Sequence, residues 1–188
     1  MNFTKMHGLG NDFIIIEDMA AALDFAAEDA VPLCHRRTGI GADGLMLARP
    51  SDKADAYMHL FNSDGSIAEM CGNGIRCFAK YVYESGIAKK PLLSIDTPAG
   101  IKLAELTLEG EAVTAVRIDM GTPLLNKADV PMQGEGICSL ETISVEDRSF
   151  LCSALNTGVP HLVVFEDGLS EKEVCHYGPL LERHHLFP

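Results

Sequence analysis

The stretch from Cys71 to Gly86, CGNGIRCFAKYVYESG, decides how the first part of this chain folds. Its apolar residues are spaced three and four apart, as on one face of an α-helix; they are Ile75, Phe78, Ala79, Val82 and Tyr83. Gly86 suits a helix end, because glycine readily takes the left-handed conformation found there. The pattern predicts an amphipathic helix that begins near residues 72–74 and turns one apolar face toward a core.

The start of this predicted helix has a chemical character of its own. Cys71 stands directly ahead of the first turn, where the positive end of the helix dipole favours a thiolate. Gly72 and Gly74 carry no side chains, so backbone N–H groups can approach a ligand carboxylate, and Asn73 adds amide donors and an acceptor. Such a site could abstract a proton α to a carboxylate. The alternative is a glycine-rich helix start with a buried cysteine.

The residues before this helix predict further elements. Residues 13–16, FIII, form a short β-branched run typical of a buried strand. A second strand is expected near residues 58–61, ahead of a turn at residues 62–65. A helix is expected over about residues 27–37, with Gly39 closing it.

The residues after it predict a β-hairpin and then a boundary. Residues 101–108 and 113–120 read as antiparallel strands. Gly, Thr and Pro at positions 121–123 break that pattern. We therefore expect a first domain over residues 1–120 and a second over residues 121–188.

A weak internal repeat supports two related domains. HGLGNDFIII at residues 7–16 resembles NTGVPHLVVF at residues 156–165, and PLCHRR at residues 32–37 resembles PLLERH at residues 179–184. Both pairs are separated by nearly the same number of residues, which indicates a duplicated unit.

Composition excludes several classes of partner. The chain has 15 Lys and Arg against 27 Asp and Glu, a net charge of −12. Such a chain repels phosphate backbones and anionic lipids, so we expect neither nucleic acid nor membrane as a partner. No apolar run approaches the roughly 18 residues that span a bilayer. The amino terminus does not resemble a signal peptide, so the expected location is the cytoplasm.

The six cysteines do not form a recognisable metal or redox motif. No C-x-x-C pair occurs, and Cys77 would point away from Cys71 on the helix, into the core. The glycine loop at residues 37–43 lacks the Lys-Ser/Thr of a P-loop, and no G-x-G-x-x-G follows a strand. The sequence therefore predicts no metal and no nucleotide or pyridoxal cofactor.

Seven short strings, in one order, resemble the diaminopimelate epimerase family. They are MHGLGNDF at residues 6–13, GIGADGL at 39–45, FNSDGS at 61–66, CGNGIRC at 71–77, TPAG at 97–100, MGTP at 120–123 and GVPH at 158–161. Each string alone is weak evidence. Together they cover essentially the whole chain and are highly specific.

The resemblance implies an α+β fold of two similar domains, each a mostly antiparallel sheet wrapped around a central helix. It implies interconversion of LL- and meso-diaminopimelate, on the route to lysine and peptidoglycan, without a cofactor. One cysteine takes the α-proton as a thiolate, and a second returns a proton to the opposite face. Members are commonly homodimers.

The resemblance also assigns roles to particular residues. It implies that Cys71 is the first catalytic cysteine and His161 an assisting histidine. It implies substrate contacts at Asn11, Asn62, Gly72 and Asn73. From the residues alone, Asn62 could instead be a turn residue and His161 a structural histidine.

Some features depart from the family pattern. Gly44 stands where some members carry a ligand-binding Gln, and Val159 where some carry a ligand-binding Asn. The internal repeat places the partner of Cys71 beyond Pro188. We therefore expect the second cysteine and its helix to lie outside this chain, the second domain to be incomplete, and the chain alone to be inactive in converting LL- to meso-diaminopimelate.

Two other functions remain open at this stage. One is a related proline-type racemase, which a panel of substrates would distinguish. The other is a non-catalytic binding or dimerisation fragment, which the intact mass of the gene product would distinguish.

Overall fold

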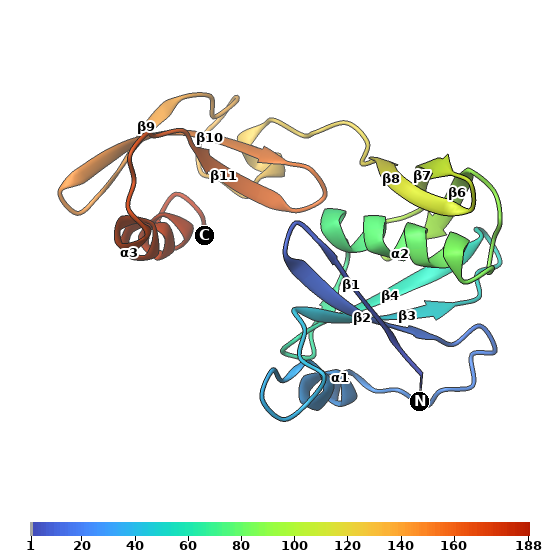
Figure 1. Cartoon of the computed structure of the whole chain (residues 1–188). Coiled ribbons are helices and arrows are strands. Elements are labelled where there is room, and N and C mark those ends of the chain that lie inside the picture. The colour runs from blue at the N-terminus through green and yellow to red at the C-terminus, as the bar shows by residue number, and fades with distance from the viewer. Residues whose placement is uncertain (1) are drawn as a thin grey trace. The chain divides into compact units, whose positions relative to one another are not determined.

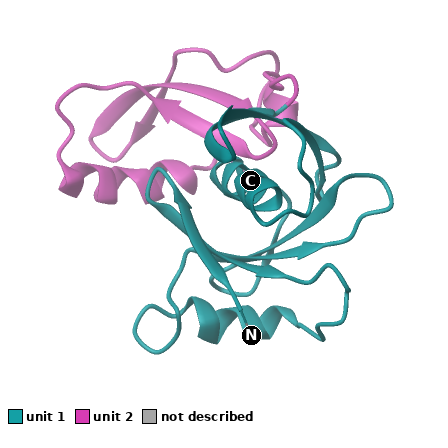
Figure 2. Ribbon diagram, turned by 45° about the vertical axis from the view of Figure 1, so that its right-hand side comes forward, with its two compact units in different colours: residues 1–120 teal, residues 121–188 magenta. Residues whose placement is uncertain are grey.

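The computed structural model describes residues 2–188, which divide into two compact units, residues 2–120 and 121–188 (Figures 1 and 2). The first unit contains β1 (Thr4–Gly8), β2 (Asn11–Glu17), α1 (Ala27–Cys34), β3 (Gly44–Arg49), β4 (Ala56–Asn62), β5 (Ile67–Ala68), α2 (Gly72–Glu84), β6 (Leu92–Asp96), β7 (Lys102–Glu109) and β8 (Ala112–Asp119). The second contains a short 3-10 helix (Lys127–Asp129), β9 (Glu141–Val145), β10 (Arg148–Asn156), β11 (Pro160–Val164) and α3 (Glu171–Glu182).

The first unit is one mixed sheet wrapped around α2. Its strand order is β1-β2-β3-β4-β6-β7-β8, with β5 beside β4. The pairs β2–β3 and β4–β6 are parallel and the remaining pairs are antiparallel. Helix α2 contacts strands from both ends of this order, namely β1, β2, β3, β4, β7 and β8. The expected α+β fold, with a mostly antiparallel sheet around a central helix, is confirmed for this unit.

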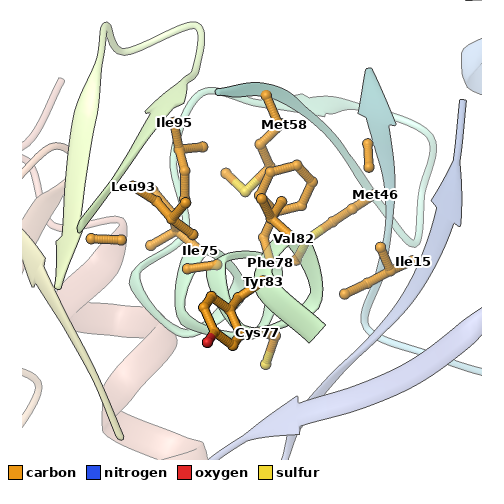
Figure 3. Packing of buried hydrophobic residues seen from close by; sticks show 14 of the residues in the cluster. Ile15, Met46, Met58, Ile75, Cys77, Phe78, Val82, Tyr83, Leu93 and Ile95 are labelled. Carbon is orange, nitrogen blue, oxygen red and sulfur yellow. The ribbon is translucent and has the colours of Figure 1, made fainter. Parts of the chain in front are cut away.

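Helices cover both faces of this sheet, which explains its apolar strands. Phe13 and Ile15 of β2 pack in the cluster that contains α2, whereas Ile14 and Ile16 pack in the cluster that contains α1. A strand buried on both faces carries consecutive rather than alternating apolar residues. Figure 3 shows the α2 side of this core, where Phe78 packs among side chains of the surrounding strands.

Helix α2 confirms the prediction from its spacing. It begins at Gly72, and Cys71 is the N-cap residue. Gly86 has φ +89°, as expected of a residue just beyond a helix end. A Cβ on Gly74 would lie 2.6 Å from Cε of Met46, so the missing side chain lets the first turn approach the sheet closely. The first turn of α2 is therefore held close against the strands.

Helix α1 is shorter than predicted. The sequence indicated residues 27–37, but the helix ends at Cys34. The Leu33 carbonyl, near the helix end, accepts a 3.0 Å hydrogen bond from the N–H of Gly41 in the returning loop. A Cβ on Gly39 would lie 2.1 Å from a carbonyl oxygen of the helix, so only glycine permits this return. The loop satisfies the terminal carbonyls that another helical turn would have occupied.

The second unit repeats part of this arrangement at smaller size. Its antiparallel sheet has the order β11-β10-β9, and α3 packs on one face. The β10–β11 hairpin followed by α3 matches the β1–β2 hairpin followed by α1, and Pro32 and Pro179 lie inside the two helices. Leu162 and Val164 join the core under α3, as Ile14 joins the one under α1. The internal repeat in the sequence thus has a structural counterpart.

Within residues 2–188, no helix combines the length and the apolar composition needed to cross a bilayer.

Candidate active site

Three strand ends meet at one edge of the large sheet. Strands β2 and β3 are parallel, and Phe13 pairs with Gly44 at their starts. Strand β4 is antiparallel to β3, so its last residue, Asn62, pairs with the same Gly44. Strands are spaced about 4.8 Å apart, so Phe13 and Asn62 lie roughly 10 Å from each other. Asn11 stands two residues before Phe13, at the same end of the sheet.

The sulfur of Cys71 lies between a hydrogen-bond donor and an acceptor. Its Sγ accepts from the N–H of Gly74 at 3.3 Å and donates to Oδ1 of Asn11 at 3.7 Å. The N–H is a partner for a thiolate, and the amide oxygen is a partner for an S–H group. Both protonation states of the half-buried thiol are therefore accommodated, as a group that takes and returns a proton requires.

An open pair of donors lies beside this sulfur. The first N–H groups of a helix have no intrahelical partners. Within the described part of the chain, those of Gly72 and Asn73 have no other partner either. A Cβ on Gly72 would meet nothing within 4 Å, so the side-chain position of Gly72 is open, unlike that of Gly74. A carboxylate could bind both N–H groups and the positive end of the helix dipole.

The side chain of Asn73 is already engaged. Its Nδ2 donates to Oδ1 of Asn11 at 3.4 Å, and its Oδ1 accepts from Arg76. A Cβ on Gly8 would lie 3.2 Å from the carbonyl oxygen of Asn73, so β1 ends close against this turn. The side chain thus connects the helix start to β2 and leaves the backbone N–H as the open donor.

Asn62 holds the turn that follows β4. Its Nδ2 donates to Oγ of Ser66 at 2.9 Å, and its backbone N–H donates to the Ser66 carbonyl at 2.8 Å. It lies at the same sheet edge as Asn11, yet nothing in residues 2–188 shows it bonded to Cys71. Its role as a turn residue is confirmed, and its role as a substrate contact stays a prediction.

The two departures from the family pattern have structural explanations. A Cβ on Gly44 would lie 2.8 Å from the backbone oxygen of Phe61, so a longer side chain would require the strand to shift. Val159 is exposed, and its carbonyl oxygen lies 2.8 Å from Nδ1 of His161. Any residue at position 159 can supply that carbonyl.

His161 lies in the second unit, on β11, whereas Cys71 belongs to the first unit. Its contact with the Val159 carbonyl places the proton on Nδ1 and leaves Nε2 as a possible base. The ring borders a cavity of about 490 Å³ within that unit, together with Phe150 and Tyr177. The structure thus brings together Cys71, Asn11, Gly72 and Asn73, places Asn62 at the same edge, and places His161 in the other unit.

A charged network behind Asn11 was not predicted from the sequence. Arg36 donates to the carboxylates of Asp12 and Asp43, each through an Nη2···Oδ1 contact of 2.7 Å. Lys5 lies 3.1 Å from the Asp12 carboxylate. Asp43 also accepts from Nδ2 of Asn11 at 2.9 Å. The string NDF contains Asp12 and the string GADG contains Asp43. A charged residue at the start of each of two strands was the signal from which this network could have been predicted.

The network keeps both aspartates ionised. Hydrogen bonds from Arg36, and the charge of Lys5, hold the pKa of Asp12 well below its usual range. The Asn11 amide, the backbone N–H of Asp12 and the Arg36 guanidinium lower the pKa of Asp43. At neutral pH both side chains therefore only accept hydrogen bonds.

The other cysteines differ from Cys71 in position and surroundings. Cys34, Cys77, Cys138 and Cys152 are buried, which confirms the expected core position of Cys77. Burial raises the pKa of Cys77 and raises that of Cys152 to about 11. Cys175 is exposed on α3. In residues 2–188, Cys71 is the cysteine that stands at a helix start, and no three His, Cys, Asp or Glu side chains are grouped to hold a metal ion.

Sequence comparison places this site in a known family. The profile of the diaminopimelate epimerase family matches residues 3–125. The chain is 44% identical over 189 residues to a diaminopimelate epimerase of Caldanaerobacter subterraneus, with 100% of the chain and 68% of the relative covered. It is 47% identical over 190 residues to that of Moorella thermoacetica, again with 100% and 68% coverage.

Solved structures share the fold at low sequence identity. A hydroxyproline epimerase from Agrobacterium vitis is similar at a TM-score of 0.63 and 16% identity, over 86% of this chain and 50% of that one. A phenazine biosynthesis protein of the PhzF family from Bacillus anthracis is similar at a TM-score of 0.56 and 18% identity, over 86% and 53% of the two chains. These likenesses support the fold, and the sequence matches identify the family. The chain belongs to the diaminopimelate epimerase family of isomerases that act on amino acids.

Proposed function

We propose that this chain supplies one proton-transferring face of a cofactor-independent epimerase that interconverts LL- and meso-diaminopimelate. The observation that carries the proposal is the position of Cys71. Its sulfur contacts a helix N–H and an amide oxygen, beside two open N–H groups. The names of the relatives supply the substrate.

In the proposed reaction, the substrate α-carboxylate binds the N–H groups of Gly72 and Asn73. The Cys71 thiolate takes the α-proton, so an S–H bond forms as the C–H bond breaks. The electron pair of that bond delocalises into the carboxylate, whose added charge the two N–H groups stabilise. Asn11 then accepts a hydrogen bond from the new S–H group. A proton delivered to the opposite face by a second thiol completes the inversion.

Other residues have supporting roles in the proposal. Asn62 contacts the substrate from the end of β4, and His161 assists through Nε2. The functional form in the proposal is a homodimer in the cytoplasm. The product serves the route to lysine and peptidoglycan.

Solvent deuterium provides the test. The chain is incubated in D₂O with LL-diaminopimelate and, separately, with L-proline and trans-4-hydroxy-L-proline, and α-deuteration is measured by mass spectrometry. We expect α-deuteration of diaminopimelate above the buffer rate and none of the two prolines. Exchange with a proline but not with diaminopimelate would favour the proline-type racemase, and exchange with none would favour a binding fragment.

A further inference from the structure

The side-chain amide of Asn11 has one orientation that satisfies its neighbours. Oδ2 of Asp43 already accepts from the backbone N–H of Asp12 at 3.1 Å and lies 2.9 Å from the Asn11 amide. An ionised carboxylate has no proton to donate, so the amide nitrogen must face it. The amide oxygen must then face the sulfur of Cys71 and the amide of Asn73.

Asp43 is itself held from three sides. Arg36 binds its second carboxylate oxygen at 2.7 Å. The backbone N–H of Asp43 donates to the carboxylate of Asp12 at 3.1 Å and to the carbonyl of Asp12 at 3.0 Å. The carboxylate that orients Asn11 is thus anchored to β2 and to the loop after α1, and it makes no direct contact with Cys71 among the described residues.

We propose that Asp43 is a positioning residue for Cys71, which acts by fixing the Asn11 amide with its oxygen toward the sulfur. That oxygen can accept from an S–H group and repels a thiolate. The arrangement therefore supports the S–H group that forms when Cys71 takes the substrate proton, because the amide oxygen stands ready to accept its hydrogen bond. This inference rests on the proposed function for its catalytic meaning, but its test does not require turnover.

The titratable groups around this arrangement include the buried thiol of Cys77 on α2, which interacts electrostatically with Cys71. Lys5 and His7 on β1, Asp12 on β2 and Arg36 after α1 lie on the Asn11 side, and His7 pairs with Asp12 in the β1–β2 register. Arg76 lies on the Asn73 side. The neighbours that hydrogen-bond to the sulfur itself are the uncharged Asn11 and Gly74. An experiment can therefore distinguish the electrostatic effect of the Asp43 carboxylate on Cys71 from the effect of the orientation of the Asn11 amide.

The test measures the rate of alkylation of Cys71 by iodoacetamide in the intact 188-residue chain, from pH 6 to 10, by peptide mass spectrometry. Asp43→Ala frees the amide, which can then turn its NH₂ toward the thiolate. A hydrogen bond to a charged group is strong enough that we expect the rate at pH 7 to rise about three- to tenfold. The pH profile should move to lower pH. Asp43→Asn keeps the side-chain volume and should move the profile in the same direction if the alanine variant does not fold.

A double substitution separates positioning from charge. Asn11→Ala removes the amide through which Asp43 acts, so adding Asp43→Ala should change the profile no further. Asp55→Ala removes a carboxylate bound to Lys90 and Ser94, and should leave the profile unchanged. Alkylation of the exposed Cys175 is the internal reference. An unchanged profile in the Asp43 variants, or an equal shift in the Asn11→Ala background, would overturn the inference and leave the proposed function standing.

Discussion

Strands β2 and β11 have the same place in their hairpins but not the same surroundings. Ile14, Ile15 and Ile16 of β2 are at most 1% exposed, since α1 and α2 cover the two faces of their sheet. On β11, Leu162 and Val164 are half-buried under α3. On the neighbouring β10, Leu151 is 54% exposed. In the first unit, α2 supplies both the second layer of the core and the cysteine at its start.

The comparison shows that α2 both packs the core of its unit and positions the proposed catalytic cysteine. The face of α2 that packs against the sheet includes Ile75, Phe78 and Val82, while its first turn holds Cys71 beside open N–H groups. Helix α3 packs through Leu181 and begins with a Ser170 capping box. The two helix starts differ in the residue at the N-cap, which is a cysteine on α2 and a serine on α3.

The largest expected difference between the units is the effect of a core truncation. Phe78→Ala removes a fully buried ring of α2 and should lower the free energy of unfolding by about 3–5 kcal/mol. Leu162→Ala removes a half-buried side chain and should cost about 1–2 kcal/mol. Urea denaturation followed by circular dichroism compares the two. Equal losses would show that the packing of the two sheets is not as different as their burial indicates.

The two glycines of the first α2 turn should differ as well. Gly74→Ala places a Cβ 2.6 Å from the end of Met46, a flexible side chain, and should destabilise the chain by about 1–3 kcal/mol. Gly72→Ala meets open space and should change stability by about 0.5 kcal/mol or less. Thermal denaturation of both variants is the measurement. A large loss in Gly72→Ala would mean that the side-chain position of Gly72 is not open.

Acid should weaken the network behind Asn11. Because Arg36 lowers the pKa of Asp12 in the folded chain, its ionised form stabilises folding above the unfolded value of about 4. That contribution is lost as the pH falls below about 4. Asp12→Asn should therefore lower the melting temperature at pH 7 and make it less dependent on pH between 5 and 3. An unchanged pH dependence would exclude Asp12 as a source of acid sensitivity.

Periodicity predicted the elements whose packing is local in sequence. The spacing of apolar residues gave α2 and its start, and the β-branched run gave β2. It failed at the end of α1, because the hydrogen bonds that end this helix come from a loop seven residues or more away. Asp43 was missed because its partner Asn11 is 32 residues distant and is reached only through strand register. The role of His161 stays a prediction, since no local pattern distinguishes a base from a structural histidine.

The central claim is that Cys71 moves the α-proton, and one measurement tests it directly. Chains carrying Cys71→Ser or Cys175→Ser are incubated with LL-diaminopimelate in D₂O, and both α-deuteration and the LL-to-meso ratio are followed. The account predicts exchange with little inversion in the unaltered chain and in Cys175→Ser, because residues 2–188 offer one thiol at a helix start. It predicts loss of exchange, by about 100-fold or more, in Cys71→Ser. Unchanged exchange in Cys71→Ser, with the fold intact by circular dichroism, would contradict the account.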